Sequence, residues 1–239
     1  MIPVYIDNHL LVAEKPAGIL SQADETGDDD MLSRGKAYIK EKFDKPGAVF
    51  LGLVHRIDRP ASGIMVFART SKAAARLTDQ FKKKLVKKVY LALVEGRPEQ
   101  TGSFEDYLLK QGGRVQTARP HVKGARLATL SYRSIYEAGG RTLVQVQLET
   151  GRSHQIRVQF ARRGFPVVGD LKYGAKTKHD GHNLALHALT LELQHPTKRE
   201  QMVFASPLPR SWGRDICEIA DALLRNGSRV RSPVFPMKS

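Results

Sequence analysis

Residues 63–69, GIMVFAR, form a continuous apolar run of the kind found in strands that are buried on both faces. The stretch before it, VHRIDRPAS, places Asp58 between Arg56 and Arg59 and then turns through Pro60. Functional side chains are often carried on loops that a rigid element positions. The sequence therefore predicts a buried strand with one acid fixed in a basic turn at its start.

The rest of the chain mixes strands with helices in no strict alternation, which favours an α+β fold. Strands are expected in 3–14 (two, around Asp7-Asn8), 49–54, 87–96, 142–151, 185–193 and 201–207, and a mixture of strands and loops in 101–141. Helices are expected in 31–42, after a Ser71 cap, from a Ser153 cap to about 163, and in 214–224. We expect one catalytic domain over residues 1–224 and a basic, disordered tail over residues 225–239.

Charge is the outlying property of the composition. The 239 residues include 39 Lys and Arg against 24 Asp and Glu, a formal net charge of +15. This excess favours a polyanionic partner, most simply nucleic acid, over a basic surface that is merely solvated.

Several other classes of protein and site are disfavoured. The single cysteine, Cys217, cannot form an internal disulfide or a thiolate cluster. HDGH (179–182) lacks an obvious third metal ligand, and Ala175 interrupts the phosphate-loop pattern in GDLKYGAKT (169–177). The start does not resemble a signal peptide, and no apolar run approaches the ~20 residues that span a bilayer. We expect a cytoplasmic protein without metal, cofactor or membrane partner, and by default a monomer.

Asp58 has two interpretations on composition alone. An acid between arginines is usually a surface salt bridge that contributes little stability. A carboxylate that neighbouring cations keep ionised also suits a nucleophile or an electrostatic stabiliser. The two interpretations are about equally supported at this point.

Two further segments carry weaker signals. In TGRSHQIRV (150–158), a helix start and Arg157 predict a site for a phosphate or for a carboxylate such as Asp58, unless Arg157 is only a surface residue. Tyr90 lies on the strand face opposite Val89 and Leu91, either as a core residue or as a platform for a base. The lysine-rich run 82–88 is either a solvated helix end or a phosphate track.

Together these segments resemble the RluA-type family of pseudouridine synthases. HRIDRPASG (55–63) is similar to the family signature His-Arg-Leu-Asp-x-x-Thr-Ser-Gly, with Ile57 for Leu and Ala61 for Thr. KKVYLALVEG (87–96) resembles the tyrosine strand and TGRSHQIRVQF (150–160) the arginine motif. KPAGIL (15–20), PVVGDLKYG (166–174) and LHA (186–188) follow the family order, so the resemblance covers about residues 3–209.

The resemblance implies a mixed, largely antiparallel sheet with flanking helices and a basic catalytic cleft. It implies that Asp58 attacks the ribose C1′ or the uracil C6 of a target uridine, without a cofactor. Arg157 would pair with Asp58, Tyr90 would stack on the uracil and help remove the C5 proton, and Arg56 would enter the RNA helix. The other expected substrate-binding residues are His55, Arg59, Arg152, His154, Gln155 and Ile156.

The expected partner is structured RNA, with ribosomal RNA slightly favoured over transfer RNA. No S4-type RNA-binding module is expected before the catalytic region. The alternative function is a non-catalytic RNA-binding or ribosome-assembly protein on the same scaffold. An RNA hydrolase fits less well, because neither a metal cluster nor a histidine pair for in-line cleavage is evident.

Overall fold

The apolar run forms the strand β4 (Ser62–Ala68), and all seven of its residues are buried in the computed structural model, which describes residues 1–181 and 183–227. β4 pairs antiparallel with β2 (Leu10–Lys15) and parallel with β10 (Leu186–Gln194). The prediction of a strand buried on both faces is therefore confirmed.

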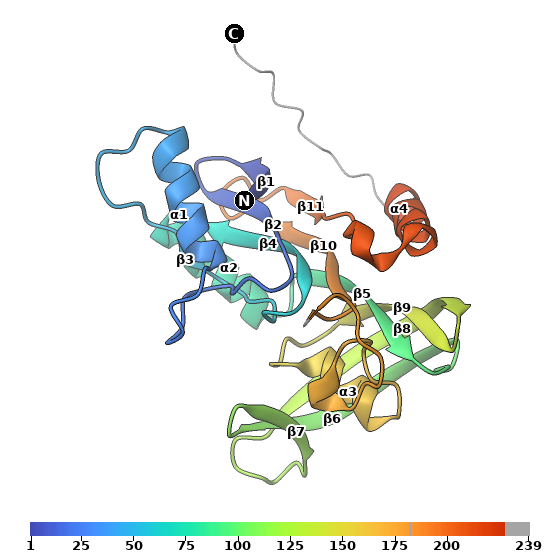
Figure 1. The fold of residues 1–239 in the computed structure, drawn as a ribbon. Helices are drawn as coiled ribbons and strands as arrows, with labels where there is room; N and C mark the ends of the chain where they lie inside the picture. The colour runs from blue at the N-terminus through green and yellow to red at the C-terminus, as the bar shows by residue number, and fades with distance from the viewer. Residues whose placement is uncertain (182, 228–239) are drawn as a thin grey trace.

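The strands form one 11-stranded sheet in the order β1-β2-β4-β10-β5-β9-β8-β6-β7, with β11 paired to β10 and β3 paired to β4 (Figure 1). Every other pairing in this sheet is antiparallel. The remaining strands are β1 (Ile2–Ile6), β3 (Gly52–Leu53), β5 (Lys87–Glu95), β6 (Thr101–Gln111), β7 (Arg114–Ala118), β8 (Arg126–Ala138), β9 (Arg141–Leu148) and β11 (Gln201–Ala205). The mixed, largely antiparallel sheet agrees with the expected α+β class.

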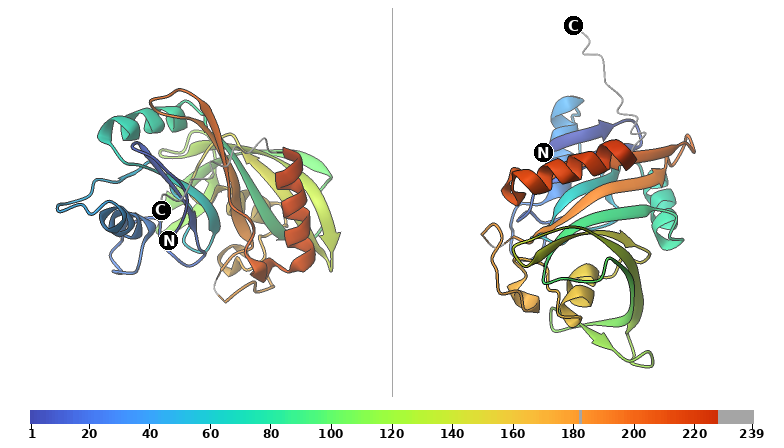
Figure 2. Two further views of the ribbon diagram at one scale, coloured as in Figure 1. Left: turned by 90° about the horizontal axis from the view of Figure 1, so that it is seen from above. Right: turned by 90° about the vertical axis from the view of Figure 1, so that its right-hand side faces the viewer.

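Within the described residues, four α-helices cover both faces of the sheet. They are α1 (Met31–Lys42), α2 (Ser71–Lys82), α3 (Gln155–Arg162) and α4 (Arg214–Gly227), with short 3-10 turns at η1 (Leu171–Tyr173) and η2 (Arg210–Trp212). α1 and α3 share one core cluster, whereas α2 and α4 pack in two others. On β5, Ala92 faces the first cluster and Leu91 and Leu93 face the α4 side, as strand alternation requires. In Figure 2 (right), β6 to β9 curl around α3.

Two helix caps differ from the expected ones. The N-cap of α2 is Thr70, whose Oγ1 accepts a hydrogen bond from the Ala73 amide at 3.1 Å, and Ser71 is the first helical residue. Adjacent Thr and Ser are both good caps, so the pattern alone does not choose between them. At α3 the N-cap is His154 in a left-handed conformation (φ 52°) rather than Ser153, and no side-chain cap bond is made.

Other boundaries shift by a few residues. Only Gly52 and Leu53 of the strand expected over 49–54 are paired. α4 runs past residue 224 to Gly227, and residues 228–239 of the expected tail lie outside the described residues. Among the described helices, none is long and apolar enough to cross a membrane.

Candidate active site

A cleft of about 760 Å³ opens between the β4 side of the sheet and α3. All ten residues selected from the sequence line it: Asp58, Tyr90, Arg157, His55, Arg56, Arg59, Arg152, His154, Gln155 and Ile156. They come from three segments of the chain, and the first and last of them, His55 and Arg157, are 102 positions apart. The fold thus brings the three sequence motifs into one site.

Asp58 lies in the turn that leads into β4, and buried polar groups hold the backbone of this turn. The Ser21 hydroxyl bonds both the Ile57 carbonyl (2.8 Å) and the Ile57 amide (3.1 Å). The buried Lys15 ammonium donates to the carbonyls of Arg59 (3.0 Å) and Ala61 (2.6 Å). The Asp58 side chain itself remains 24% exposed, so a rigid turn presents this carboxylate to the cleft.

Arg157 connects Asp58 to a second acid beneath it. Its Nη1 donates to Asp58 Oδ2 at 3.1 Å, while Nε and Nη2 bind both carboxylate oxygens of the buried Asp170 at 2.7 and 2.9 Å. Burial opposes the charge of Arg157, but the hydrogen bonds and charges of Asp170 and Asp58 raise its pKa overall. Arg157 is thus a fixed cation beneath the candidate nucleophile, and not a surface residue.

Asp170 belongs to a motif that could be recognised in the sequence, but the sequence assigned no role to it. It lies in PVVGDLKYG, where an acid between glycines resembles a solvated turn. In the structure its side chain is only 1% exposed. The same turn carries Tyr173, whose ring lies 5.1 Å from the Arg157 guanidinium. Only the three-dimensional structure shows that this acid is buried against the helix of the arginine motif.

Tyr90 lines the cleft from β5. Burial, together with the Asp58 charge, raises the pKa of the Tyr90 phenol above its ordinary value. The phenol therefore stays protonated at neutral pH and resembles a hydroxyl donor more than a phenolate base. A protonated phenol that lines the cleft is suited to contact a nucleobase.

The histidine and arginines beside Asp58 have distinct surroundings. His55 stacks on Phe81 at 4.9 Å, and burial, with the Lys88 charge, lowers the pKa of His55 to about 3. Arg59 is bound within the protein, through Asp28 at 2.7 Å and the Gly18 carbonyl at 3.0 Å. Arg56 is exposed at the cleft. Of these three side chains, Arg56 is the best placed to reach a bound macromolecule.

The residues around the start of α3 mostly shape the wall of the cleft. The buried Gln155 side chain accepts from the Arg152 amide at 3.0 Å and from the Thr150 hydroxyl at 2.7 Å. Arg152 Nε donates to the Leu127 carbonyl at 2.9 Å, and Ile156 belongs to the main core cluster. Gln155 and Ile156 therefore support the site from behind.

Positive charge dominates the lining of the cleft. Three carboxylates line it, from Asp24, Asp58 and Glu149. They face eight basic side chains: Arg56, Arg59, Lys82, Lys84, Lys88, Lys110, Arg152 and Arg157. Burial is the main reason that the pKa of Lys88 is lowered to about 8, and the neighbouring Arg152 and Lys84 charges add to the effect. An anionic ligand would relieve this repulsion.

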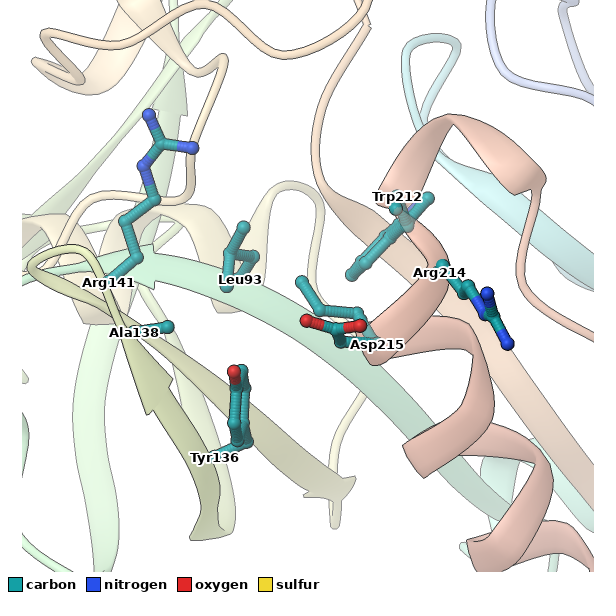
Figure 3. A pocket seen from close by; sticks show the side chains of 9 residues that line it. Leu93, Tyr136, Ala138, Arg141, Trp212, Arg214 and Asp215 are labelled. Carbon is teal, nitrogen blue, oxygen red and sulfur yellow. The ribbon is translucent and has the colours of Figure 1, made fainter.

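A second, smaller cavity of about 280 Å³ lies on the opposite side of the sheet, at the start of α4 (Figure 3). Its walls include Leu93, Tyr136, Arg141, Trp212 and Asp215. None of the ten candidate site residues selected from the sequence lines it, so we place the candidate site in the larger cleft. Among residues 1–181 and 183–227, no group of three or more His, Cys, Asp and Glu side chains is arranged to hold a metal ion. His182 of HDGH is not among the residues that the structure describes.

The chain is similar to pseudouridine synthases over most of its length. It is 34% identical over 224 residues to the ribosomal large subunit pseudouridine synthase D of Pseudomonas aeruginosa, covering 87% of this chain and 68% of the relative. It is 41% identical over 159 residues to an uncharacterised RNA pseudouridine synthase of Chloroflexus aurantiacus, covering 66% of this chain and 50% of the relative. The chain thus spans half to two thirds of the length of these two relatives.

The fold has close counterparts among solved structures. Human RNA pseudouridylate synthase domain containing 4 superposes with a TM-score of 0.74 at 23% identity, over 94% of this chain and 93% of that one. Human RNA pseudouridylate synthase domain containing 1 superposes with a TM-score of 0.66 over 90% of this chain and 86% of that one. Residues 9–162 also match the family described as RNA pseudouridylate synthase. The resemblance seen in the motifs is therefore confirmed, and the chain belongs to the RNA pseudouridylate synthase family, whose enzymes are isomerases that act on uridine in RNA.

Proposed function

We propose that this protein isomerises uridine to pseudouridine in structured RNA, with the Asp58 carboxylate as the nucleophile. One observation carries the proposal: of the three acids that line the cleft, Asp58 is the one that Arg157 binds, at 3.1 Å, among eight basic side chains. In a site that serves only to bind a polyanion, holding a carboxylate at this place costs free energy, because like charges repel. It is useful where the acid reacts with the bound RNA.

The reaction breaks one bond and forms another within the same nucleotide. Asp58 attacks either the ribose C1′ or the uracil C6, the N-glycosidic bond breaks, and the uracil turns so that its C5 joins C1′. C5 then loses its proton, and N1, which has lost its bond to C1′, takes up a proton, so the atoms balance. Asp58 is released unchanged, so the isomerisation consumes no co-reactant.

The other side chains of the cleft supply binding and orientation. Arg157 keeps a positive charge beside Asp58, and Tyr90 packs against the uracil with its hydroxyl inside the cleft. The target nucleotide must leave its helix to reach Asp58, which costs a few kcal/mol. The exposed Arg56 is placed to fill the gap, because a guanidinium can both stack and donate hydrogen bonds.

We further propose that the substrate is ribosomal RNA rather than transfer RNA. The support is that the relative from Pseudomonas aeruginosa, and those from Nitrosomonas europaea and Zymomonas mobilis at 33% identity, are named ribosomal large subunit pseudouridine synthase D. The alternative remains a non-catalytic RNA-binding protein that uses the same basic cleft.

The deciding experiment uses total RNA from cells that lack this gene. The RNA is incubated with the wild-type protein or with Asp58→Ala, and pseudouridines are mapped as carbodiimide-dependent stops of reverse transcription. New stops with the wild type only, in ribosomal RNA, are the expected result. Stops that persist with Asp58→Ala would exclude Asp58 as the nucleophile. RNA crosslinking to both proteins without new stops would favour the binding protein.

A further inference from the structure

His154 lies between Asp58 and Tyr173, with one ring nitrogen toward each. Its Nδ1 is 2.7 Å from the Tyr173 hydroxyl, and its Nε2 is 4.0 Å from Asp58 Oδ2. The residue has a left-handed backbone (φ 52°) at the start of α3. This conformation is uncommon for a residue with a side chain, although it is tolerated better by His than by most. Here it accompanies an imidazole held at the candidate nucleophile.

The hydrogen-bond network assigns the tautomer of His154. The Tyr173 oxygen already accepts a hydrogen bond from the Val115 amide at 3.1 Å. If the tyrosine donates its own proton to Nδ1, both groups are satisfied and neutral His154 carries its hydrogen on Nε2. The opposite tautomer would leave the Tyr173 proton without an acceptor among the described residues. The Nε2–H group therefore faces Asp58.

Two nitrogen groups lie nearest the same oxygen of Asp58. Arg157 Nη1 donates to Oδ2 at 3.1 Å, whereas His154 Nε2 lies 4.0 Å from Oδ2, which is beyond hydrogen-bond distance. Within residues 1–181 and 183–227, no group donates a hydrogen bond to Oδ1. The two carboxylate oxygens are thus unequal before any substrate binds.

We propose that His154 is a positioning residue for Asp58: held in the Nε2–H form by Tyr173, it closes on Oδ2 beside Arg157 when RNA binds and leaves Oδ1 as the atom that attacks. This inference rests on the proposed function. Burial lowers the pKa of His154, with Asp58 and Asp170 opposing and Arg157 and Lys172 adding to the effect, which agrees with a neutral ring. A neutral His154 ring presents its Nε2–H to Oδ2 and carries no additional proton that could transfer to the Asp58 carboxylate.

Oδ1 and Oδ2 keep these separate roles whether Oδ1 attacks C1′ or C6. If Oδ1 bonds to C1′, the electron pair of the N-glycosidic bond goes to the uracil. If Oδ1 bonds to C6, the pair of the C5–C6 double bond moves toward the uracil O4. In both cases Oδ2 becomes the carbonyl oxygen of an ester, bound by Arg157 and approached by His154. When the ester breaks, the negative charge returns to an oxygen that already has partners.

The variants His154→Asn and His154→Gln separate positioning from folding. Asn tolerates the left-handed backbone well but is too short to reach Asp58 with its amide, whereas Gln has the reach to restore a donor. We expect His154→Asn to lower kcat by about tenfold to a hundredfold with little change in KM, and His154→Gln to recover part of the loss. An unchanged kcat, or a change in KM alone, would overturn the proposal.

Tyr173→Phe tests the tautomer in a readout that needs no activity. Long-range ¹H–¹⁵N spectra of protein labelled at histidine, with His154 assigned from the His154→Asn spectrum, should show a bare Nδ1 and a protonated Nε2. The Tyr173→Phe protein should show a mixture of tautomers, and Asp58→Asn should shift the Nε2 signal. A protonated Nδ1 in the wild type would overturn the proposal. A wild type that makes no pseudouridine would refute the proposed function, while the spectra still decide the orientation of the imidazole.

Discussion

Asp170 binds Arg157 through two hydrogen bonds, Nε to Oδ2 at 2.7 Å and Nη2 to Oδ1 at 2.9 Å, so that the remaining Nη1 points at Asp58. Fork-to-fork pairing of this kind fixes the plane of the guanidinium as well as its position. The orientation of the cation beneath the candidate nucleophile is therefore set by an acid that does not touch the cleft surface.

Replacing Asp170 by Asn should disable the site without removing any group that contacts RNA. The amide of Asn can accept only one of the two hydrogen bonds, and a buried pair that loses one partner costs about 3–5 kcal/mol of stability. We expect kcat to fall about tenfold or more while RNA affinity is kept. Asp106→Asn is the matched control, because Asp106 pairs with Arg163 at the far end of α3 (2.8 Å) and does not line the cleft. Equal kcat in folded Asp170→Asn and wild type would contradict this role.

Gly63 should be irreplaceable because β10 passes directly against it. Its backbone is at φ 128°, and a Cβ there would lie 2.3 Å from the Ala188 carbonyl oxygen. Gly63→Ala must therefore separate β4 from β10, in addition to the 1–3 kcal/mol of backbone strain typical of such a conformation. Gly139→Ala is the control, because Gly139 also has a positive φ (58°) but nothing within 4 Å. Urea unfolding should show a loss of about 1 kcal/mol in the control and clearly more in Gly63→Ala.

The elements that local patterns determine were predicted well from the sequence. The apolar run of β4, the alternation of β5 and the helical spacing of α1 each arise within a dozen residues. The parallel pairing of β4 with β10 was not predicted, since it joins residues such as Ser62 and His187 that are far apart in the chain. No local pattern specifies such a contact.

The same distinction separates the site residues. Asp58 and Arg157 could be selected because the family resemblance implied a role for each, whereas Asp170 and Tyr173 lie in a turn whose composition suggests solvent exposure. Their importance arises from burial against α3, which the turn sequence does not encode by itself. The left-handed backbone of His154 was missed for a related reason, because Ser153 is a much commoner helix cap.

His187 should make the protein sensitive to acid. The ring is buried between Ser62 Oγ (2.8 Å from Nδ1) and the Ser206 carbonyl (2.9 Å from Nε2), and burial lowers its pKa to about 4. The unfolded chain, with a histidine pKa of about 6.5, binds the extra proton first as the pH falls. Folding stability should therefore decrease from about pH 6.5 to about pH 4, by up to ~3 kcal/mol from this group.

The measurement is urea unfolding of the wild type and His187→Gln at about pH 7 and about pH 4. The variant should be less stable at neutral pH but should lose less stability on acidification. His121→Gln, at an exposed position, should keep the wild-type dependence. Because the half-buried His55, whose pKa is also lowered, contributes in the same direction in all three proteins, the difference between them isolates His187. Parallel curves for wild type and His187→Gln would show that acid acts elsewhere.

Lys84 and Lys88 should contribute to RNA affinity through phosphates. Both line the cleft, and the Lys88 ammonium lies 3.3 Å from the Thr150 carbonyl. Each phosphate contact that is removed should reduce the slope of log affinity against log salt by about 0.7–1. We expect this reduction in Lys84→Gln and Lys88→Gln but not in Lys36→Gln, whose side chain is exposed on α1 outside the cleft. Filter binding over a salt series measures the slope, and identical slopes in all four proteins would place the RNA elsewhere.

Tyr90→Phe should separate the stacking of the Tyr90 ring on a base from the chemical role of its hydroxyl. Phenylalanine keeps the stacking surface, so RNA binding should be retained. The variant loses the hydroxyl, which accepts and donates no hydrogen bond among the described residues and is therefore free for the substrate. If that hydroxyl takes part in proton movement at C5, turnover should fall by about a hundredfold or more. Single-turnover release of tritium from [5-³H]uridine RNA measures this step directly. Tyr90→Leu is the companion variant, which should weaken binding as well because it removes the stacking surface. Wild-type turnover in Tyr90→Phe would exclude the hydroxyl from proton transfer and leave only the ring as the functional group.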